Sequence, residues 1–134
     1  MNRAWDILVR APLLIGVALI LAQTLPVLES RWLWFSDEVR YAEVYSNLIR
    51  DGHWVVLNLN GEAYPDKPPL FFLLLALLDL IPGVQMPGVM WLGSAVSAIF
   101  LLFAMRALAN AVGMTREGFS AGILIQLCFL GMVV

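Results

Sequence analysis

The sequence predicts an all-α membrane protein, with transmembrane helices and an outer loop that carries a short juxtamembrane amphipathic helix and a small hairpin. Hydrophobic residues make up 61% of the 134 residues and charged residues 13%, whereas soluble domains have about 45–50% and about 25%. Several apolar runs have the length of membrane helices. Most ionisable side chains gather in one stretch, residues 29–67. These three observations together predict the fold class.

The first predicted span covers residues 11–28, an almost wholly apolar run that matches a hydrocarbon core of about 30 Å. Arg3 and Arg10 precede it and an acid-rich loop follows, which predicts a cytoplasmic N-terminus and an outer loop at residues 29–67. A cleaved signal peptide is the alternative, but the run is long for one and no A-x-A cleavage site follows.

Three further spans are predicted at residues 68–83, 86–108 and 119–134. The last run has no charge or cap after it, which favours a single N-terminal fragment, residues 1–134, of a larger polytopic membrane domain. Small residues at four-residue spacing in the 86–108 run favour close helix packing.

The topology after the loop has two interpretations. Simple alternation of the spans puts Arg106 and Arg116 on the side of the acidic loop, against the positive-inside tendency. Either these two arginines do not affect orientation, or residues 70–81 do not fully cross the membrane. Three complete spans and part of a fourth are the prediction.

The loop begins with Trp32 and Trp34, which are typical of the aromatic belt at a membrane interface. An amphipathic helix is predicted for residues 37–51, capped at its start by Ser36 or Asp37.

Signals for the end of this helix and for a hairpin follow it. Gly52 suits the residue that ends a helix in a left-handed conformation. Asn60-Gly61 predicts a tight turn, on which residues 62–64 fold back. A hairpin this short needs support from elsewhere.

Two charged positions mark the ends of the loop. Asp37 and Glu38 are ordinarily helix caps, but at a membrane surface, partly buried by Trp32, Trp34 and lipid, an acid is a candidate general base. Arg40 and Tyr41 share its helix face. Lys67 is ordinarily a snorkelling anchor, but it also precedes a helix start, where it can bind a lipid phosphate.

Other site types have little support in the sequence. His53 is the only histidine and Cys128 the only cysteine, so multi-histidine metal sites and intrachain disulfides are excluded within this segment. No basic stripe or tail indicates a nucleic-acid partner.

The loop motifs resemble the first periplasmic loop of the aminoarabinose transferase and protein O-mannosyltransferase superfamily, integral membrane glycosyltransferases of the GT-C fold. Several motifs in the correct succession carry this resemblance over about a quarter of the chain: Asp37-Glu38-x-Arg40-Tyr41-Ala42-Glu43, Gly52-x-Trp54, Leu59-Asn60-Gly61-x-x-Tyr64 and Asp66-Lys67-Pro68-Pro69-Leu70. His53 and Pro65 depart from the family pattern, but neither is part of the acidic pair.

The resemblance implies an enzyme that moves a sugar from a polyprenyl-phosphate carrier to a lipid, protein or glycan acceptor at the outer membrane face, with inversion. It implies a catalytic role for Asp37, substrate binding by Glu38, Arg40, Tyr41 and Lys67, and a divalent metal at the position of Asp66 in some members. It also implies a bacterial inner (plasma) membrane with a periplasmic loop, and a fragment that is inactive alone.

A non-enzymatic transporter or assembly subunit that binds a ligand with its outer loop is the alternative function. Transporters place ionisable groups inside their spans. Asp79 is the only real candidate for such a group, and it lies near the end of a run, so the sequence favours the transferase.

Overall fold

The computed structural model describes residue 7, residues 9–28 and residues 31–130, with the side chains of residues 124–130 excepted. The described part is mostly helical and divides into two compact units. The loop unit comprises Thr24–Ala95, and the helical unit comprises Met1–Gln23 with Val96–Val134. Cys128 lies outside the described side chains.

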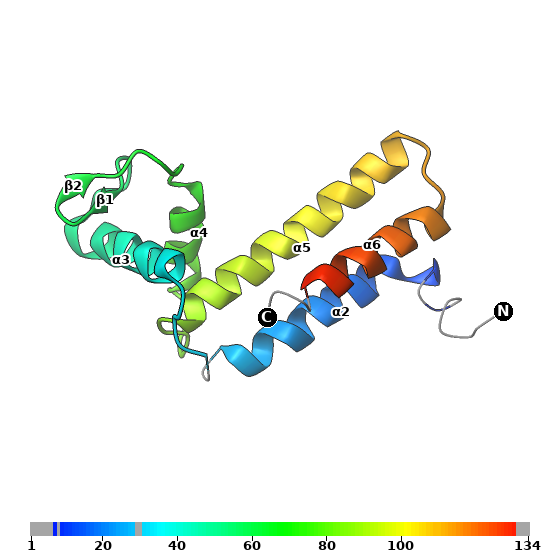
Figure 1. Cartoon of the computed structure of the whole chain (residues 1–134), viewed down its shortest axis with the longest axis horizontal. Coiled ribbons are helices and arrows are strands. Elements are labelled where there is room, and N and C mark those ends of the chain that lie inside the picture. The colour runs from blue at the N-terminus through cyan, green and yellow to red at the C-terminus, as the bar shows by residue number, and fades with distance from the viewer. Residues whose placement is uncertain (1–6, 8, 29–30, 131–134) are drawn as a thin grey trace. The chain divides into compact units, whose positions relative to one another are not determined.

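The helical unit is built from α2 (Pro12–Thr24), the second part of α5 (Gly88–Ala111) and α6 (Arg116–Leu130), as Figure 1 shows. Apolar side chains of all three helices form its core: Leu13, Val17, Ile20, Leu102, Met105, Ala109, Phe119 and Ile123. Gly16 permits a close approach between α2 and α5, because a Cβ there would lie 2.7 Å from Leu102 Cδ2.

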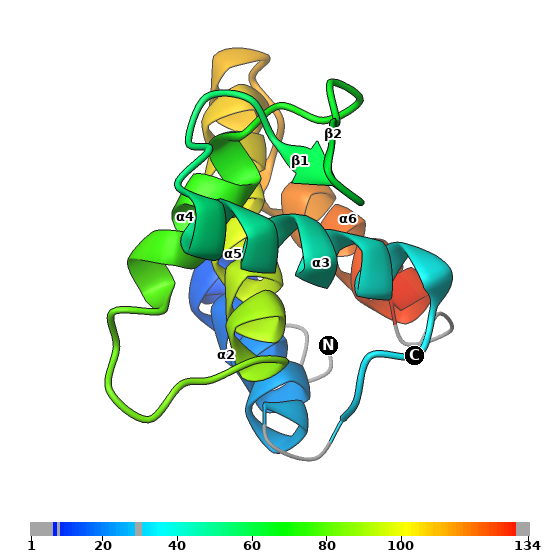
Figure 2. The same ribbon diagram turned by 90° about the vertical axis from the view of Figure 1, so that its left-hand side faces the viewer.

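The loop unit is organised around α3 (Ser36–Asp51). Its buried face is made by Val44, Tyr45 and Leu48, which are at most 3% exposed. Phe72 and Leu75 of α4 (Leu70–Leu78) pack in the same core. Figure 2 shows α4 and the hairpin beside α3. The helix predicted for residues 37–51 is thus present and amphipathic, although Asp37 and Arg40 on its predicted face are exposed.

The start of α3 differs from the sequence prediction. The helix begins at Ser36, and neither Ser36 nor Asp37 supplies its cap. Glu38, in the first turn, instead accepts hydrogen bonds from the backbone N–H groups of Trp34 and Phe35, at 2.9 and 3.3 Å. A carboxylate three residues into a helix can reach back in this way, which leaves Asp37 free for other contacts.

The end of α3 and the hairpin confirm the sequence prediction. Gly52 has a φ of 72° and its N–H donates to Leu48 O. Strands β1 (Asn58–Leu59) and β2 (Glu62–Ala63) pair antiparallel across Asn60-Gly61, whose φ values are 54° and 82°. These positive φ values suit the type I′ turn that Asn-Gly favours. The short hairpin is supported by α3, because the Asn47 side chain donates to Asn58 O at 3.2 Å.

Helix lengths bear on the topology. Among the described residues, only α5 (Gly88–Ala111) is long and apolar enough to cross a membrane, and Pro12–Val27 is a shorter apolar helix. α4 has 9 residues, which span only about 13 Å of the about 30 Å of a hydrocarbon core. Whether residues 70–81 cross the membrane stays a prediction.

Candidate functional site

Asp37 and Arg40 lie one turn apart at the N-terminal end of α3. Asp37 Oδ1 is 3.4 Å from Arg40 Nη1, and their side chains are 68% and 44% exposed. Because both side chains are exposed, both groups are accessible to a ligand. Exposed ion pairs of this kind add little stability.

The burial that we expected around Asp37 is not observed. The side chain is mostly exposed, and Trp32 and Trp34 are 80% and 83% exposed themselves. The tryptophans therefore do not cover the carboxylate. Together with Phe35, which is 61% exposed, they form an outward aromatic surface of the kind found at membrane interfaces.

Lys67, at the C-terminal end of the loop, lies beside Tyr41 of the same helix, α3. Its ammonium nitrogen lies 5.9 Å from the centroid of the Tyr41 ring. The pKa of Lys67 is raised above its ordinary value, chiefly by a side-chain hydrogen bond to Tyr41, with smaller contributions from the charges of Tyr64 and Asp37. The two ends of the loop therefore meet around Tyr41.

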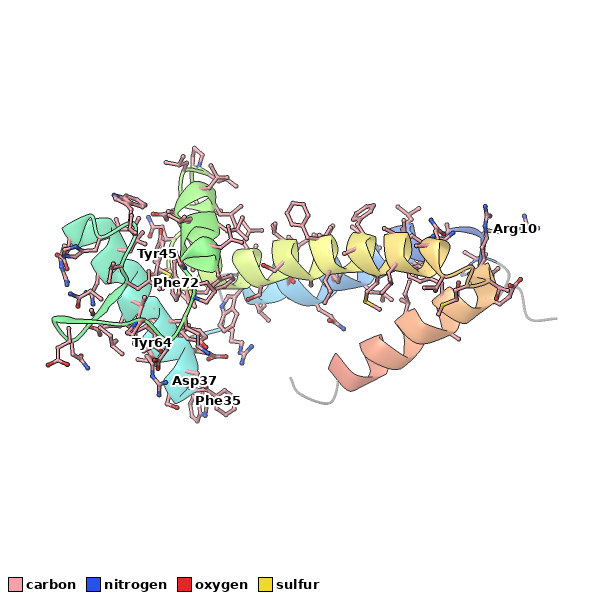
Figure 3. The ribbon with its side chains drawn as sticks, turned by 90° about the horizontal axis from the view of Figure 1, so that it is seen from above. Arg10, Phe35, Asp37, Tyr45, Tyr64 and Phe72 are labelled. Atoms are coloured by element: carbon pink, nitrogen blue, oxygen red, sulfur yellow. The ribbon has the colours of Figure 1, made fainter. Side chains whose placement is uncertain are left out.

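Tyr64 is the member of this cluster that was not among the predicted site residues. The pKa of Arg40 is raised first by a side-chain hydrogen bond to Tyr64 and then by the Asp37 charge. The backbone N–H of Tyr64 donates to Leu57 O at 2.7 Å, which fixes the chain after β2. Figure 3 shows Tyr64 near Asp37. The sequence signal that could have identified Tyr64 was its place in the Asn60-Gly61-x-x-Tyr64 motif.

Glu38 is occupied by contacts within the protein. Besides its two backbone hydrogen bonds, it accepts one from Arg31 Nη2 at 3.1 Å, between side chains that are 21% and 32% exposed. The Arg31 guanidinium in turn lies over the Trp91 ring, 4.5 Å from its centroid. These contacts favour a structural role for Glu38, and its predicted role in substrate binding stays a prediction.

Asp66 is exposed and stays a prediction as a metal ligand. In residues 7, 9–28 and 31–130, no group of three or more histidine, cysteine, aspartate or glutamate side chains could hold a metal ion. His53 is also exposed. A divalent metal at Asp66 would need further ligands from a substrate or from residues outside these ranges.

The loop unit also contains a cavity of about 390 Å³, lined by Leu28, Arg31, Trp32 and residues 83–88. None of the predicted site residues lines it. The chemically richer feature is the surface cluster of one carboxylate, two cations and two phenols, which we call the loop cluster: Asp37, Arg40, Tyr41, Tyr64 and Lys67. Two cations with hydroxyl groups can bind a phosphate, and a neighbouring carboxylate can accept a proton.

No family model and no solved structure matches the chain. Curated proteins with significant similarity include the undecaprenyl phosphate-α-4-amino-4-deoxy-L-arabinose arabinosyl transferase of Pseudomonas savastanoi pv. phaseolicola, 29% identical over 113 residues, which cover 84% of this chain and 21% of the relative. A transferase of the same description from Pseudomonas fluorescens Pf0-1 is 31% identical over 113 residues, 82% of this chain and 20% of the relative. That of Pectobacterium carotovorum PC1 is 44% identical over 41 residues, 31% of this chain and 7% of the relative.

The chain spans about a fifth of the length of the first two of these relatives. Over that part, the similarity supports a glycosyltransferase family for this chain.

Proposed function

We propose that this chain is part of a membrane glycosyltransferase that moves a sugar from a polyprenyl-phosphate carrier to a lipid, protein or glycan acceptor at the outer membrane face, with inversion. The observation that supports the proposal is the loop cluster, in which Lys67 lies 5.9 Å from the centroid of the Tyr41 ring, on the helix that also carries the Asp37–Arg40 pair. The relatives' names specify undecaprenyl phosphate and aminoarabinose, so this is the first sugar donor to test.

Arg40 and Lys67 have the charge to bind the carrier phosphate. Both side chains are exposed cations at neutral pH, and Arg40 can donate two parallel hydrogen bonds to phosphate oxygens. The phosphate gains negative charge as the sugar leaves it. Positioned cations that stabilise this charge lower the barrier to transfer.

Asp37 serves the acceptor. The acceptor oxygen forms a bond to the anomeric carbon, the bond from that carbon to the carrier phosphate oxygen breaks, and the acceptor proton passes to the Asp37 carboxylate. Arg40, 3.4 Å from Asp37, orients the carboxylate. Direct displacement from the opposite side inverts the anomeric configuration.

An Asp37→Asn substitution in the full-length protein tests the proposal. We expect sugar transfer in membranes to fall at least about 100-fold, the scale of general acid–base catalysis, while carrier affinity stays within about threefold, since the substitution removes no cation. Asp51→Asn is the matched control, because Asp51 is an acid at the other end of α3 and should transfer like the wild type.

Wild-type transfer by Asp37→Asn would remove Asp37 from the mechanism. If the carrier nevertheless bound and no transfer of any donor were detected even with the wild-type protein, the loop would be a ligand-binding loop of a non-enzymatic membrane protein.

A further inference from the structure

A second cluster of charge lies in the helical unit, apart from the loop cluster. Arg10, Arg106 and Arg116 line one cavity of about 330 Å³, which we call the arginine cavity; its other lining residues are Ala11, Pro12, Leu13 and Leu14. Figure 3 shows Arg10 at the end of α5 that leads into α6. Arginines that precede α2 and flank the α5–α6 connection thus gather at one end of the unit, as the positive-inside tendency expects.

Arg106 has an unmet hydrogen-bonding group. Its guanidinium carbon lies 4.9 Å from the centroid of the Phe119 ring, which holds the group in a stacked position. Its Nη1 atom is buried and has no hydrogen-bond partner among the described residues. An unsatisfied buried donor on a charged group is costly, and Arg106 is one of the residues that line the arginine cavity.

The charge of the arginine cavity is not compensated by its described lining. Three arginines are among the residues that line it, and no acidic residue of the described part of the chain is. Arg116 is the first residue of α6, so the positive end of the helix dipole adds to the same field. Glu117, the acid in that first turn, is exposed and is not part of the lining.

We infer that the arginine cavity binds a phosphate group. Guanidinium groups match phosphate oxygens with paired hydrogen bonds. The adjacent apolar residues Leu13 and Leu14, the second of which is 70% exposed, suit the acyl chain of an anionic phospholipid. A free phosphate offers the same oxygens without the acyl contact. The inference is independent of the proposed sugar transfer, since no residue of the loop cluster takes part.

Binding to the purified full chain in detergent tests the inference. The probes are dioctanoyl phosphatidic acid, inorganic phosphate at constant ionic strength, and dioctanoylglycerol, which has the same acyl chains without phosphate. We expect phosphatidic acid to bind at least about tenfold more tightly than dioctanoylglycerol. Arg106→Gln and Arg116→Gln should each weaken it by about tenfold, the scale of a lost charged hydrogen bond. Arg50→Gln, at an exposed arginine of α3, is the control and should leave binding unchanged.

Arg116 lies at an exposed helix start, so Arg116→Gln tests the site even if Arg106→Gln unfolds the chain. Inorganic phosphate binding with the same sensitivity to both variants would identify free phosphate as the source, and binding of phosphatidic acid alone would identify a lipid headgroup; either supports the site. Equal affinity for phosphatidic acid and dioctanoylglycerol, or an unaltered affinity in Arg116→Gln, would overturn it.

Discussion

Removal of the Glu38 side chain should loosen the start of α3 without a direct effect on the ligand groups. Glu38→Ala deletes two hydrogen bonds to the backbone N–H groups of Trp34 and Phe35 and one to Arg31. Loss of a helix-capping group costs about 0.5–2 kcal/mol. The Arg31 pair is partly exposed, so it adds no more than about 1 kcal/mol.

A total of about 0.5–3 kcal/mol corresponds to an opening equilibrium about 2–150-fold larger. Hydrogen–deuterium exchange should therefore be faster by this factor in peptides that contain residues 34–40. Glu43→Ala is the matched control, because Glu43 is an exposed acid on the same helix and gains the same helix propensity. Unaltered exchange in Glu38→Ala, together with a loss of carrier binding, would refute the capping role and return Glu38 to substrate binding.

Three further outcomes are expected. Gly93→Val should destabilise the chain by about 1–3 kcal/mol, because a Cβ at Gly93 meets the Leu75 side chain. Thermal unfolding in detergent measures this against Gly122→Ala, a control at a glycine with open space. Equal melting temperatures for the two variants would contradict the prediction. Leu48→Ala should cost about 2–5 kcal/mol, because Leu48 is 1% exposed in the core of the loop unit; a loss below about 1 kcal/mol in denaturant titration would contradict it. The pKa of Lys67 is raised from 10.5, so its ammonium group stays charged below that raised value. Carrier affinity should therefore hold from about pH 7 to about pH 10 and fall only at higher pH. A decline in affinity centred near about pH 8.5 would point to another group.

Local signals in the sequence predicted the local structure of the loop. Asn60-Gly61 defines its turn because few other residues adopt two successive positive φ values. Gly52 ends α3 for the same reason. The spacing along residues 37–51 predicted an amphipathic α3, since a helix places residues three and four apart on one side, and Val44 and Leu48 of the predicted face are buried.

Features that depend on distant parts of the chain were harder to predict. Tyr64 joins the site only because β2 and the loop after it return the chain to α3, and no local pattern specifies which side chain then meets Arg40. Glu38 was indistinguishable from Asp37 as an acid in a first turn, and only the path of residues 31–35 decides which of them caps the helix. The cover that Trp32 and Trp34 were expected to give Asp37 is not observed, because both tryptophans are themselves exposed.

The central claim is that the two ends of the loop form one phosphate-binding site. Its most direct test is the affinity of the full-length protein for undecaprenyl phosphate in Lys67→Ala and Arg40→Gln, measured beside Arg50→Gln. Arg50 lies at the other end of α3, paired with Asp51, and serves as the matched cation. The account predicts that each of the first two substitutions weakens carrier binding by about tenfold or more while Arg50→Gln does not. Equal affinity in all three variants and the wild type would contradict it.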